Sequence, residues 1–314
     1  MRPGPPDDGR VRTVFLGSGS FALPALRALA TSPLVQVVAV VTVVPKPVGR
    51  TQAFTPTPVE AAARDLHLGP VLTPPRLRAP EAVDAILSLR PSLAVLADYG
   101  QIVPPPLLDL RHGALNLHPS PLPRFRGASP VPATILAGDE ETAVTLMRMD
   151  AGLDTGPIVA QERVPLTGTE TGPVLEARLA ALGGQLLERS LAGWLSGELV
   201  ATPQPAEGVV LTKPLRREDG RLDPSLPAVV LERAVRAYLP WPGTFTEVDG
   251  ERLVVTAAAV ATEEPGDVPG ALVRVGSLPA LATTDGRLVL VSVTPAGRRA
   301  MSGADWLRGR RTRA

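Results

Sequence analysis

The sequence has no cysteine, so it can form no disulfide, no thiolate nucleophile and no cysteine-ligated metal site. Histidine is scarce as well, and only His67, His112 and His118 can supply an imidazole. Long hydrophobic runs are also missing, since the longest, residues 34–44, has about half of the roughly 20 residues that a membrane helix needs. The first ten residues lack the basic start and apolar run of a secretory signal. Together these absences predict a cytoplasmic protein without a membrane span.

A strong overall charge is absent too. The net charge is +1, so the whole molecule has no field that would attract nucleic acid. The charge is unevenly distributed, however, because the residues from Gly270 to the end contain eight arginines against two aspartates. This local excess fits either a contact with a polyanion or a solvated terminus.

What is present is a regular alternation of apolar strands and helices over the first two thirds of the chain. The expected strands cover residues 11–16, 34–43, 70–72, 92–97, 113–117, 142–149 and 157–165, and the expected helices cover 21–29, 58–66, 81–89 and 172–195. Near-continuous apolar strands separated by helices predict an α/β fold, with a doubly wound, mostly parallel, Rossmann-like sheet covered on both faces.

A different pattern begins after residue 200. Several prolines and mixed charges are typical of a linker, and they are followed by one expected helix and by short alternating segments such as ERLVVTAAAV and RLVLVSVTP. These segments predict a small closed or partly open β-barrel, for which the oligonucleotide-binding (OB) type is one candidate. We therefore expect an α/β domain over residues 1–200, a linker over 201–225 and a β-barrel domain over 226–314.

Two glycine-containing motifs suggest functions that the rest of the chain does not favour. The turn GSGSFA, residues 17–22, satisfies the G-x-G-x-x-A dinucleotide fingerprint, but residues 37–44 offer no acid to hold a ribose, so no nicotinamide cofactor is expected. The triplet Asp154-Thr-Gly occurs once, whereas an aspartic protease needs two such carboxylates sharing a proton. Both motifs are interpreted as turns.

The most informative segment is GALNLHPSPLPRFRG, residues 113–127. Asn116 and His118 are two residues apart at the end of an expected strand, so their side chains point to one face while Leu115 and Leu117 point to the other. The carboxyl end of a central parallel strand is where open α/β sheets build their ligand crevices. Because an amide and an imidazole can both donate hydrogen bonds to a developing oxyanion, the pair is predicted to be catalytic.

This segment, N-x-H-x-S-x-L-P-x-[aromatic]-R-G-A followed by G-L-D-T-G, resembles the folate-dependent formyltransferase family. The likeness covers nearly the whole chain, with V-F-L-G, P-V-G-R, T-P-T-P-V and Y-G-Q-I in the first half. In the second half, R-A-Y-L-P-W-P and P-A-G-R-R-A-M resemble the appended barrel of the members that act on methionyl-tRNA. The resemblance implies a monomeric enzyme of translation initiation that moves a formyl group from 10-formyltetrahydrofolate to the amino group of initiator methionyl-tRNA. It implies no permanently bound cofactor and no metal.

By motif match, the resemblance implies that Asn116, His118 and Asp154 form the catalytic set. Asn116 and a protonated His118 would stabilise the oxyanion, while Asp154 would orient His118 and pass protons. The implied folate-binding residues are Tyr99, Gly100, Ser120, Pro121, Leu122 and Pro123. The implied tRNA-binding residues are Lys46, Arg50, Arg298 and Arg299.

Three features depart from the family pattern. Pro121 replaces a leucine in the folate loop, and Asp98 stands where a small apolar residue is expected. Between residues 45 and 56 the chain keeps Lys46 and Arg50 but has T-Q-A where further basic residues are expected. Fewer phosphate contacts from this loop would make tRNA binding depend more on the arginine-rich C-terminus.

Other functions would use parts of the same sequence. A sugar-nucleotide or purine-precursor formyltransferase would share the first domain, and a formyltetrahydrofolate hydrolase would use the same triad with water as the acceptor. The barrel and its basic tail favour a tRNA acceptor instead. A non-catalytic nucleic-acid-binding protein would leave Asn116, His118 and Asp154 without a purpose.

Overall fold

The structure is a computed structural model that describes residues 9–45, 47–48 and 53–311. The chain forms two compact units whose segments interleave. Unit 1 takes the residues up to Gly127 together with Thr142–Val164 and Glu176–Leu211, and unit 2 takes Ala128–Glu141, Pro165–Leu175 and the residues from Thr212 onward.

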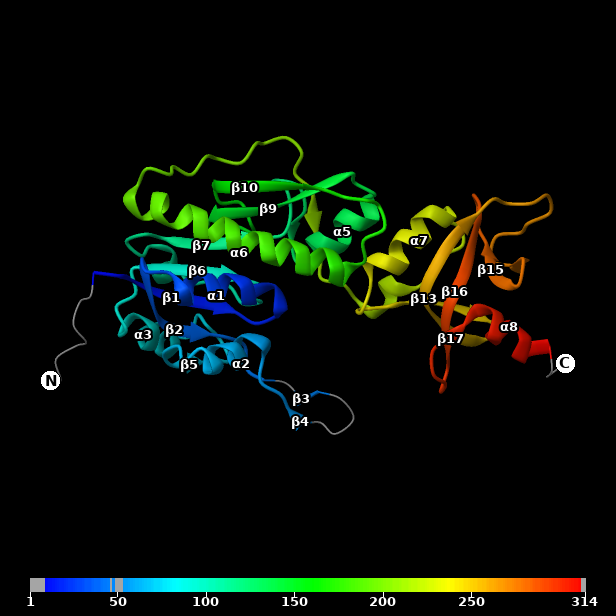
Figure 1. The fold of residues 1–314 in the computed structure, drawn as a ribbon, viewed down its shortest axis with the longest axis horizontal. Helices are drawn as coiled ribbons and strands as arrows, with labels where there is room; N and C mark the ends of the chain where they lie inside the picture. The colour runs from blue at the N-terminus through cyan, green and yellow to red at the C-terminus, as the bar shows by residue number, and fades with distance from the viewer. Residues whose placement is uncertain (1–8, 46, 49–52, 312–314) are drawn as a thin grey trace. The chain divides into compact units, whose positions relative to one another are not determined.

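Unit 1 is built on a seven-stranded sheet in the order β10-β9-β7-β6-β1-β2-β5 (Figure 1). The strands are β1 Val11–Gly17, β2 Val35–Val41, β5 Val71–Leu72, β6 Leu93–Ala97, β7 Ala114–His118, β9 Glu141–Arg148 and β10 Ile158–Pro165. Each neighbouring pair from β5 through β2, β1 and β6 to β7 is parallel, and β9 is antiparallel to β7. The predicted mostly parallel sheet is confirmed.

Helices cover both faces of this sheet. They are α1 Leu23–Thr31, α2 Pro58–Asp65, α3 Pro80–Leu87, α4 Pro105–Leu108 and α6 Gly172–Ser196, with a short 3-10 helix at Ser20–Ala22. On one face α6 approaches β7 so closely that a Cβ at Gly183 would lie 3.6 Å from Leu117. On the other face, Ile86 of α3 and Leu107 of α4 join a buried cluster with side chains of β1, β2, β6 and β7.

The strand order reverses between β1 and β6. From β1 the chain moves outward to β2 and β5, then returns to place β6 on the other side of β1. The loops after β1 and β6 therefore diverge, which is the switch point where doubly wound sheets bind ligands. At this point the Ser18 N–H donates to the Asp98 carbonyl at 3.0 Å, joining the glycine-rich turn to the loop after β6.

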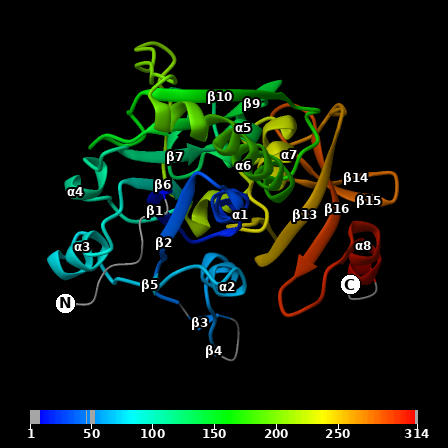
Figure 2. The same ribbon diagram turned by 60° about the vertical axis from the view of Figure 1, so that its left-hand side comes forward.

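Unit 2 contains an antiparallel sheet in the order β12-β13-β16-β15-β14, with β17 paired to β16. The strands are β12 Thr244–Val248, β13 Glu251–Ala261, β14 Leu272–Val275, β15 Leu278–Ala282, β16 Arg287–Pro295 and β17 Met301–Ser302. Figure 2 shows the two long strands β13 and β16 side by side. Register shifts between Val255 and Ala258 bend β13, and β12 and β14 remain the two edges of the described sheet. The result is a curled half-barrel, which is the partly open form of the predicted barrel.

Three helices complete unit 2: α5 Pro130–Ala137, α7 Ala228–Ala237 and α8 Gly303–Arg311. The apolar positions of α7, among them Ala228, Leu231 and Val235, follow helical spacing and join the buried cluster over the sheet. Trp306 brings α8 into the same cluster. The remaining short elements are β3 Pro47–Val48, β4 Ala53–Phe54, β8 Arg126–Gly127, β11 Leu211–Thr212 and a 3-10 helix at Arg217–Gly220. In the described part of the chain, every helix is too short or too polar to cross a membrane.

Candidate active site

Asn116 and His118 lie at the carboxyl end of strand β7 in unit 1. This strand lies between β6 and β9, where Asn116 is in register with Leu96 and Met147. Leu117 is buried on the opposite face, toward α6, so alternation along the strand directs Asn116 and His118 away from that helix. Asn116 is half-buried, and its amide makes no hydrogen bond to any of the described protein groups. It is therefore available to a ligand.

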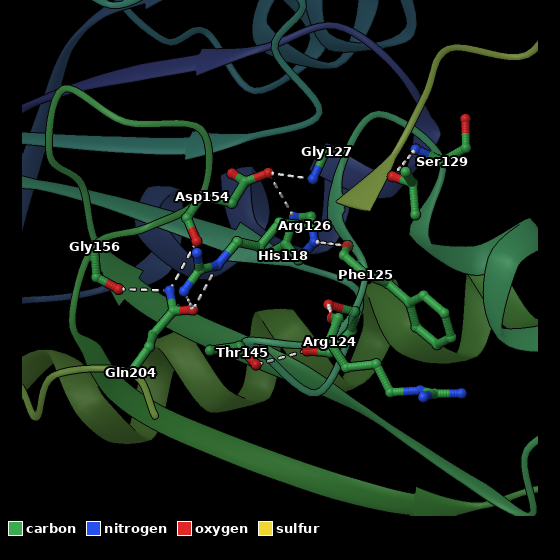
Figure 3. Close-up of polar contacts among 12 residues, drawn as sticks. His118, Arg124, Phe125, Arg126, Gly127, Ser129, Thr145, Asp154, Gly156 and Gln204 are labelled. Carbon is green, nitrogen blue, oxygen red and sulfur yellow. Dashed lines mark hydrogen bonds and ion pairs between the residues drawn. The ribbon is translucent and has the colours of Figure 1, made fainter. Parts of the chain in front are cut away.

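His118 is buried, with 5% of its surface exposed, and its ring is held by a main-chain group (Figure 3). Its Nε2 lies 2.9 Å from the carbonyl oxygen of Phe125, a residue with φ of 60°. A carbonyl oxygen only accepts hydrogen bonds, so Nε2 carries a proton in this arrangement. The other nitrogen, Nδ1, lies 3.7 Å from Oδ2 of Asp154, which is within ion-pair reach but too long for a direct hydrogen bond.

Asp154 is fixed by the turn in which it lies. Its backbone has φ of 51°, and its Oδ2 accepts a hydrogen bond of 2.8 Å from the Gly127 N–H. Asp150 stabilises the same turn, because its Oδ1 accepts from the Thr155 hydroxyl at 2.7 Å. Gly156 is required for close packing, since a Cβ there would lie 1.9 Å from the Arg148 carbonyl oxygen. The carboxylate is thus aimed at His118 by local structure.

Gln204 also supports this site, although sequence reasoning did not identify it. Its Nε2 donates to the carbonyl oxygens of Asp154 at 2.8 Å and Gly156 at 2.7 Å (Figure 3). Its Oε1 accepts from Arg126 Nε at 3.0 Å and Nη2 at 2.7 Å. One amide therefore ties the Asp154 turn to the segment that holds His118. No local pattern could reveal a contact between residues 50 positions apart in the sequence.

The predicted folate loop is braced from within. The Ser120 hydroxyl donates to the Arg124 carbonyl at 2.7 Å, and the Ser120 carbonyl accepts from Thr145 Oγ1 at 2.6 Å. The side chains of Ser120 and Leu122 are buried, at 0% and 3% exposure, whereas Pro121 and Pro123 are half-buried. A ligand at this loop would therefore meet the two prolines and the main chain.

Tyr99 and Gly100 follow β6, at the switch point of the sheet. The Tyr99 ring packs against the buried cluster of unit 1 rather than toward solvent. Its hydroxyl is buried without a hydrogen-bond partner among the described residues, and burial raises the pKa of Tyr99 to about 12. Gly100 is exposed with open space around its Cα. Contacts with a ligand would come from Gly100 and the main chain.

Asp98 bridges the loop after β6 and the glycine-rich turn. It has φ of 48°, its carboxylate accepts a hydrogen bond from the Gly19 N–H, and a Cβ at Gly19 would lie 1.9 Å from its Oδ2. Desolvation raises the pKa of Asp98, and the Gly19 hydrogen bond opposes this shift. Desolvation also raises the pKa of Glu176, with a further contribution from the Asp98 charge and an opposing hydrogen bond from Ser20.

The predicted tRNA-binding residues are not part of this cluster. Lys46 and Arg50 lie outside the described residues. Arg298 and Arg299 lie in unit 2, exposed in the turn between β16 and β17, where the Arg298 N–H donates to the Pro295 carbonyl at 3.0 Å. Neither guanidinium forms an ion pair within the described part of the chain.

A Rossmann-like sheet that brings an amide, an imidazole and a carboxylate together at the carboxyl end of β7 has the groups that an enzyme needs to stabilise an oxyanion and move a proton. The chain belongs to the formyl transferase family: residues 11–191 match the family described as formyl transferase, and residues 214–311 match its C-terminal domain.

The curated proteins of this family to which the chain is similar include methionyl-tRNA formyltransferases. The chain is 45% identical over 305 residues to the one from Roseiflexus sp. (strain RS-1), covering 96% of this chain and 93% of that protein. It is 44% identical over 302 residues to the one from Myxococcus xanthus (strain DK1622), covering 96% and 95%.

Solved structures share the fold at lower identity. An N-formyltransferase from Helicobacter canadensis, solved with folinic acid and dTDP-3-aminofucose, matches with a TM-score of 0.65 at 15% identity, covering 89% of this chain and 98% of that one. A methionyl-tRNA formyltransferase from Clostridium thermocellum matches with a TM-score of 0.52 at 15% identity, covering 82% and 95%.

Proposed function

We propose that this protein transfers the formyl group of 10-formyltetrahydrofolate to the α-amino group of initiator methionyl-tRNA, in the cytoplasm, for translation initiation. The observation that carries the proposal is the 45% identity to a methionyl-tRNA formyltransferase over nearly the full length of both proteins. The N-formyltransferase from Helicobacter canadensis shares only 15% identity with this chain. That likeness supports a common fold but not a common acceptor.

The reaction begins with a neutral amine. An α-amino group titrates near 7.7 to 8, so a useful fraction of methionyl-tRNA carries a free base at neutral pH. The amine nitrogen bonds to the formyl carbon, and the formyl oxygen becomes an oxyanion. The unpartnered Asn116 amide donates a hydrogen bond to this oxygen. The bond from the formyl carbon to N10 of the folate then breaks, and the proton released by the amine ends on N10.

His118 supports the same charge through its cationic form. Its Nε2–H is occupied by the Phe125 carbonyl at 2.9 Å, so Nδ1 is the nitrogen that gains and loses a proton during the reaction. Nδ1 faces the Asp154 carboxylate at 3.7 Å, so a proton on this nitrogen would lie beside a negative charge. Asp154, held by the Gly127 N–H, then relays the proton through water toward N10.

The substrates are expected to use the loops around this centre. The formyl-folate is a co-substrate rather than a bound cofactor, held by the Tyr99–Gly100 main chain and the Ser120–Pro123 loop. The tRNA is held by Lys46, Arg50, Arg298 and Arg299, and the enzyme acts as a monomer.

The direct test is incubation of the purified protein with 10-formyltetrahydrofolate and charged initiator tRNA, followed by detection of formylmethionine on that tRNA. Arg90→Ala changes an exposed position before β6, at the amino ends of the strands and so away from the proposed site. This variant is the control for correct folding of the purified protein. Release of formate without formylated tRNA would indicate a hydrolase. Formylation of a sugar-nucleotide amine in preference to the tRNA would indicate the sugar branch.

A further inference from the structure

A cavity of about 370 Å³ lies at the amino edge of the unit 1 sheet. It is formed by the first residues of β1 and β2, the last turn of α1 and the turn that follows α2. Because β1 and β7 run in one direction in the sheet, this cavity and the carboxyl end of β7 lie at opposite edges. The proposed catalytic groups therefore take no part in it.

All the ionisable side chains of the lining are basic. They are Arg10, Arg12 and His67, and no aspartate or glutamate lines the cavity in the described part of the chain. Arg10 and His67 are exposed, whereas Arg12 is half-buried. Two guanidinium groups and an imidazole that can be protonated attract an anion.

Arg12 is held in place before any ligand binds. Its Nε and Nη2 donate to the Leu89 carbonyl at 2.9 and 2.6 Å, and its Nη1 donates to Gln36 Oε1 at 3.1 Å. These contacts use three of the five N–H groups of a guanidinium. One N–H on each terminal nitrogen thus has no partner among the described residues and can bind an anion. A side chain that is already ordered also loses less conformational entropy on binding.

The main chain shapes the wall of the cavity. The pairing of β2 with β1 skips one residue, Val38, which therefore forms a bulge. Bulges are rare between parallel strands, and they are often found beside functional sites. The turn after α2 packs tightly on this bulge, where a Cβ at Gly69 would lie 2.8 Å from the Val38 carbonyl oxygen. Within that turn, His67 has φ of 52°. Close main-chain packing thus fixes the position of His67 in the lining.

Two helices end at this edge, and the carbonyl groups of their last turns could repel an anion. Hydrogen bonds at both ends reduce this effect. At the end of α2 the Ala63 carbonyl accepts from the Leu68 N–H at 3.0 Å, and at the end of α1 the Leu29 carbonyl accepts from the Ser32 N–H at 3.3 Å. The basic side chains therefore dominate the charge at the cavity.

We propose that this cavity binds a small phosphorylated anion, at a site separate from the proposed active site. A phosphate group carries more charge than a carboxylate at neutral pH and offers three acceptor oxygens, so it can contact Arg10, Arg12 and His67 together. The lining also contains the apolar side chains of Leu29 and Leu68, and about 370 Å³ leaves room for an organic group beside the phosphate. A nucleotide has both parts, whereas inorganic phosphate has only the first.

The experiment measures binding of ADP, inorganic phosphate and acetate to the full chain by calorimetry. ADP should bind more tightly than phosphate, which lacks the organic group, and acetate should bind least because it also carries less charge. In the Arg10→Ala/His67→Ala variant, which changes two exposed side chains, the Kd for ADP should rise about tenfold or more. Arg111→Ala, a change at an exposed arginine on the same edge of the sheet but outside the lining, is the matched control and should leave this Kd unchanged.

An unchanged Kd for ADP in the double variant would overturn the inference, and so would the absence of binding of ADP and phosphate to the wild type at millimolar concentration. A loss of tRNA affinity with the Kd for ADP unchanged would also overturn it and would assign Arg10 and His67 to an RNA-binding surface. If phosphate binds as tightly as ADP and the variant loses both, the anion site stands, with the free ion as its ligand. None of these measurements requires formyl transfer, so the inference and the proposed function can fail separately.

Discussion

At the scale of single residues, Asn116 is the side chain on which the proposed chemistry depends most. It is the only asparagine in the sequence, and its amide has no hydrogen-bond partner in the described part of the chain. We expect Asn116→Ala to lower kcat by about 10²–10³, because it removes one donor to the oxyanion. Rapid-quench kinetics with saturating folate and tRNA measures this change. Folate binding should stay the same, and a kcat within tenfold of wild type would disprove the role.

Gly19 and Asp98 should be energetically coupled. A Cβ at Gly19 would lie 1.9 Å from Asp98 Oδ2, although the backbone of Gly19, with φ of −88°, would accept an alanine. Gly19→Ala should therefore lower the free energy of unfolding by about 1–3 kcal/mol through overpacking. Adding Asp98→Ala removes the atom that clashes and should recover most of the loss. Additive effects of the two changes in urea denaturation would contradict this coupling.

The sequence predicted part of the site because strand periodicity is a local property. Alternation along one strand placed Asn116 and His118 on one face, and the turn containing Asp154 was visible as a glycine-rich motif. The groups that hold the histidine and aspartate were not predictable in this way. The Phe125 carbonyl and the Gly127 N–H are main-chain groups with no side-chain pattern, and Gln204 acts from a distant part of the chain.

At the scale of elements, strand periodicity predicted the sheet of unit 1 well, whereas the one-turn helix Pro105–Leu108 and two longer helices were missed. Pro130–Ala137 contains two prolines in its first turn and is apolar on nearly all sides, so no polar face marks its helical spacing in the sequence. Gly303–Arg311 was interpreted as part of a basic tail, because its arginines and glycines conceal the apolar contacts of Trp306 and Leu307 with the core. Long-range packing, rather than local propensity, stabilises both helices.

A buried arginine links the loop between β13 and β14 to the start of β16 in unit 2. Arg287 is 5% exposed, and its Nε and Nη2 contact the two oxygens of Asp267 at 2.6 and 2.8 Å. Hydrogen bonding to Arg287 lowers the pKa of Asp267. A lowered pKa in the folded state adds stability above the ordinary aspartate range, and this stability is lost as the pH falls through the folded value.

Asp267→Asn should therefore lower the melting temperature of the protein at pH 7. The difference from wild type should shrink as the pH falls below about 4, because the carboxylate of the wild type is then protonated as well. Differential scanning calorimetry from pH 3 to pH 8 measures both effects. Glu251→Gln, a change at an exposed carboxylate of β13 that forms no ion pair in the described part of the chain, serves as a control for unit 2, and a pH-independent difference for Asp267→Asn would contradict the explanation.

At the scale of the whole molecule, the predicted domain boundaries, with a linker over residues 201–225, stay a prediction. In the structure, each compact unit is assembled from three separate segments of the chain. Sequence patterns follow chain order, so they could not show that residues 128–141 and 165–175 pack with the C-terminal half. The half-barrel itself was predictable, because short alternating strands separated by turns extend over one continuous region.

Binding of the tRNA should depend on the turn between β16 and β17. We expect Arg298→Ala/Arg299→Ala to raise the KM for tRNA. The slope of log affinity against log salt should become shallower by about one to two, because each phosphate contact that is lost means about one counterion fewer released on binding. Initial rates between 50 and 200 mM salt measure this slope, and the KM for folate should not change. A salt slope equal to that of wild type would exclude these arginines from the interface.

Gln204 limits how this enzyme could be recombined with its relatives. The residue lies between the two stretches that match the family domains, 11–191 and 214–311, yet its amide holds the turn of Asp154. A chimaera that takes its C-terminal half from another species, with the crossover before position 204, would import the side chain that holds the proposed catalytic turn along with the barrel. The crossover that keeps one parent's active site whole lies after this residue.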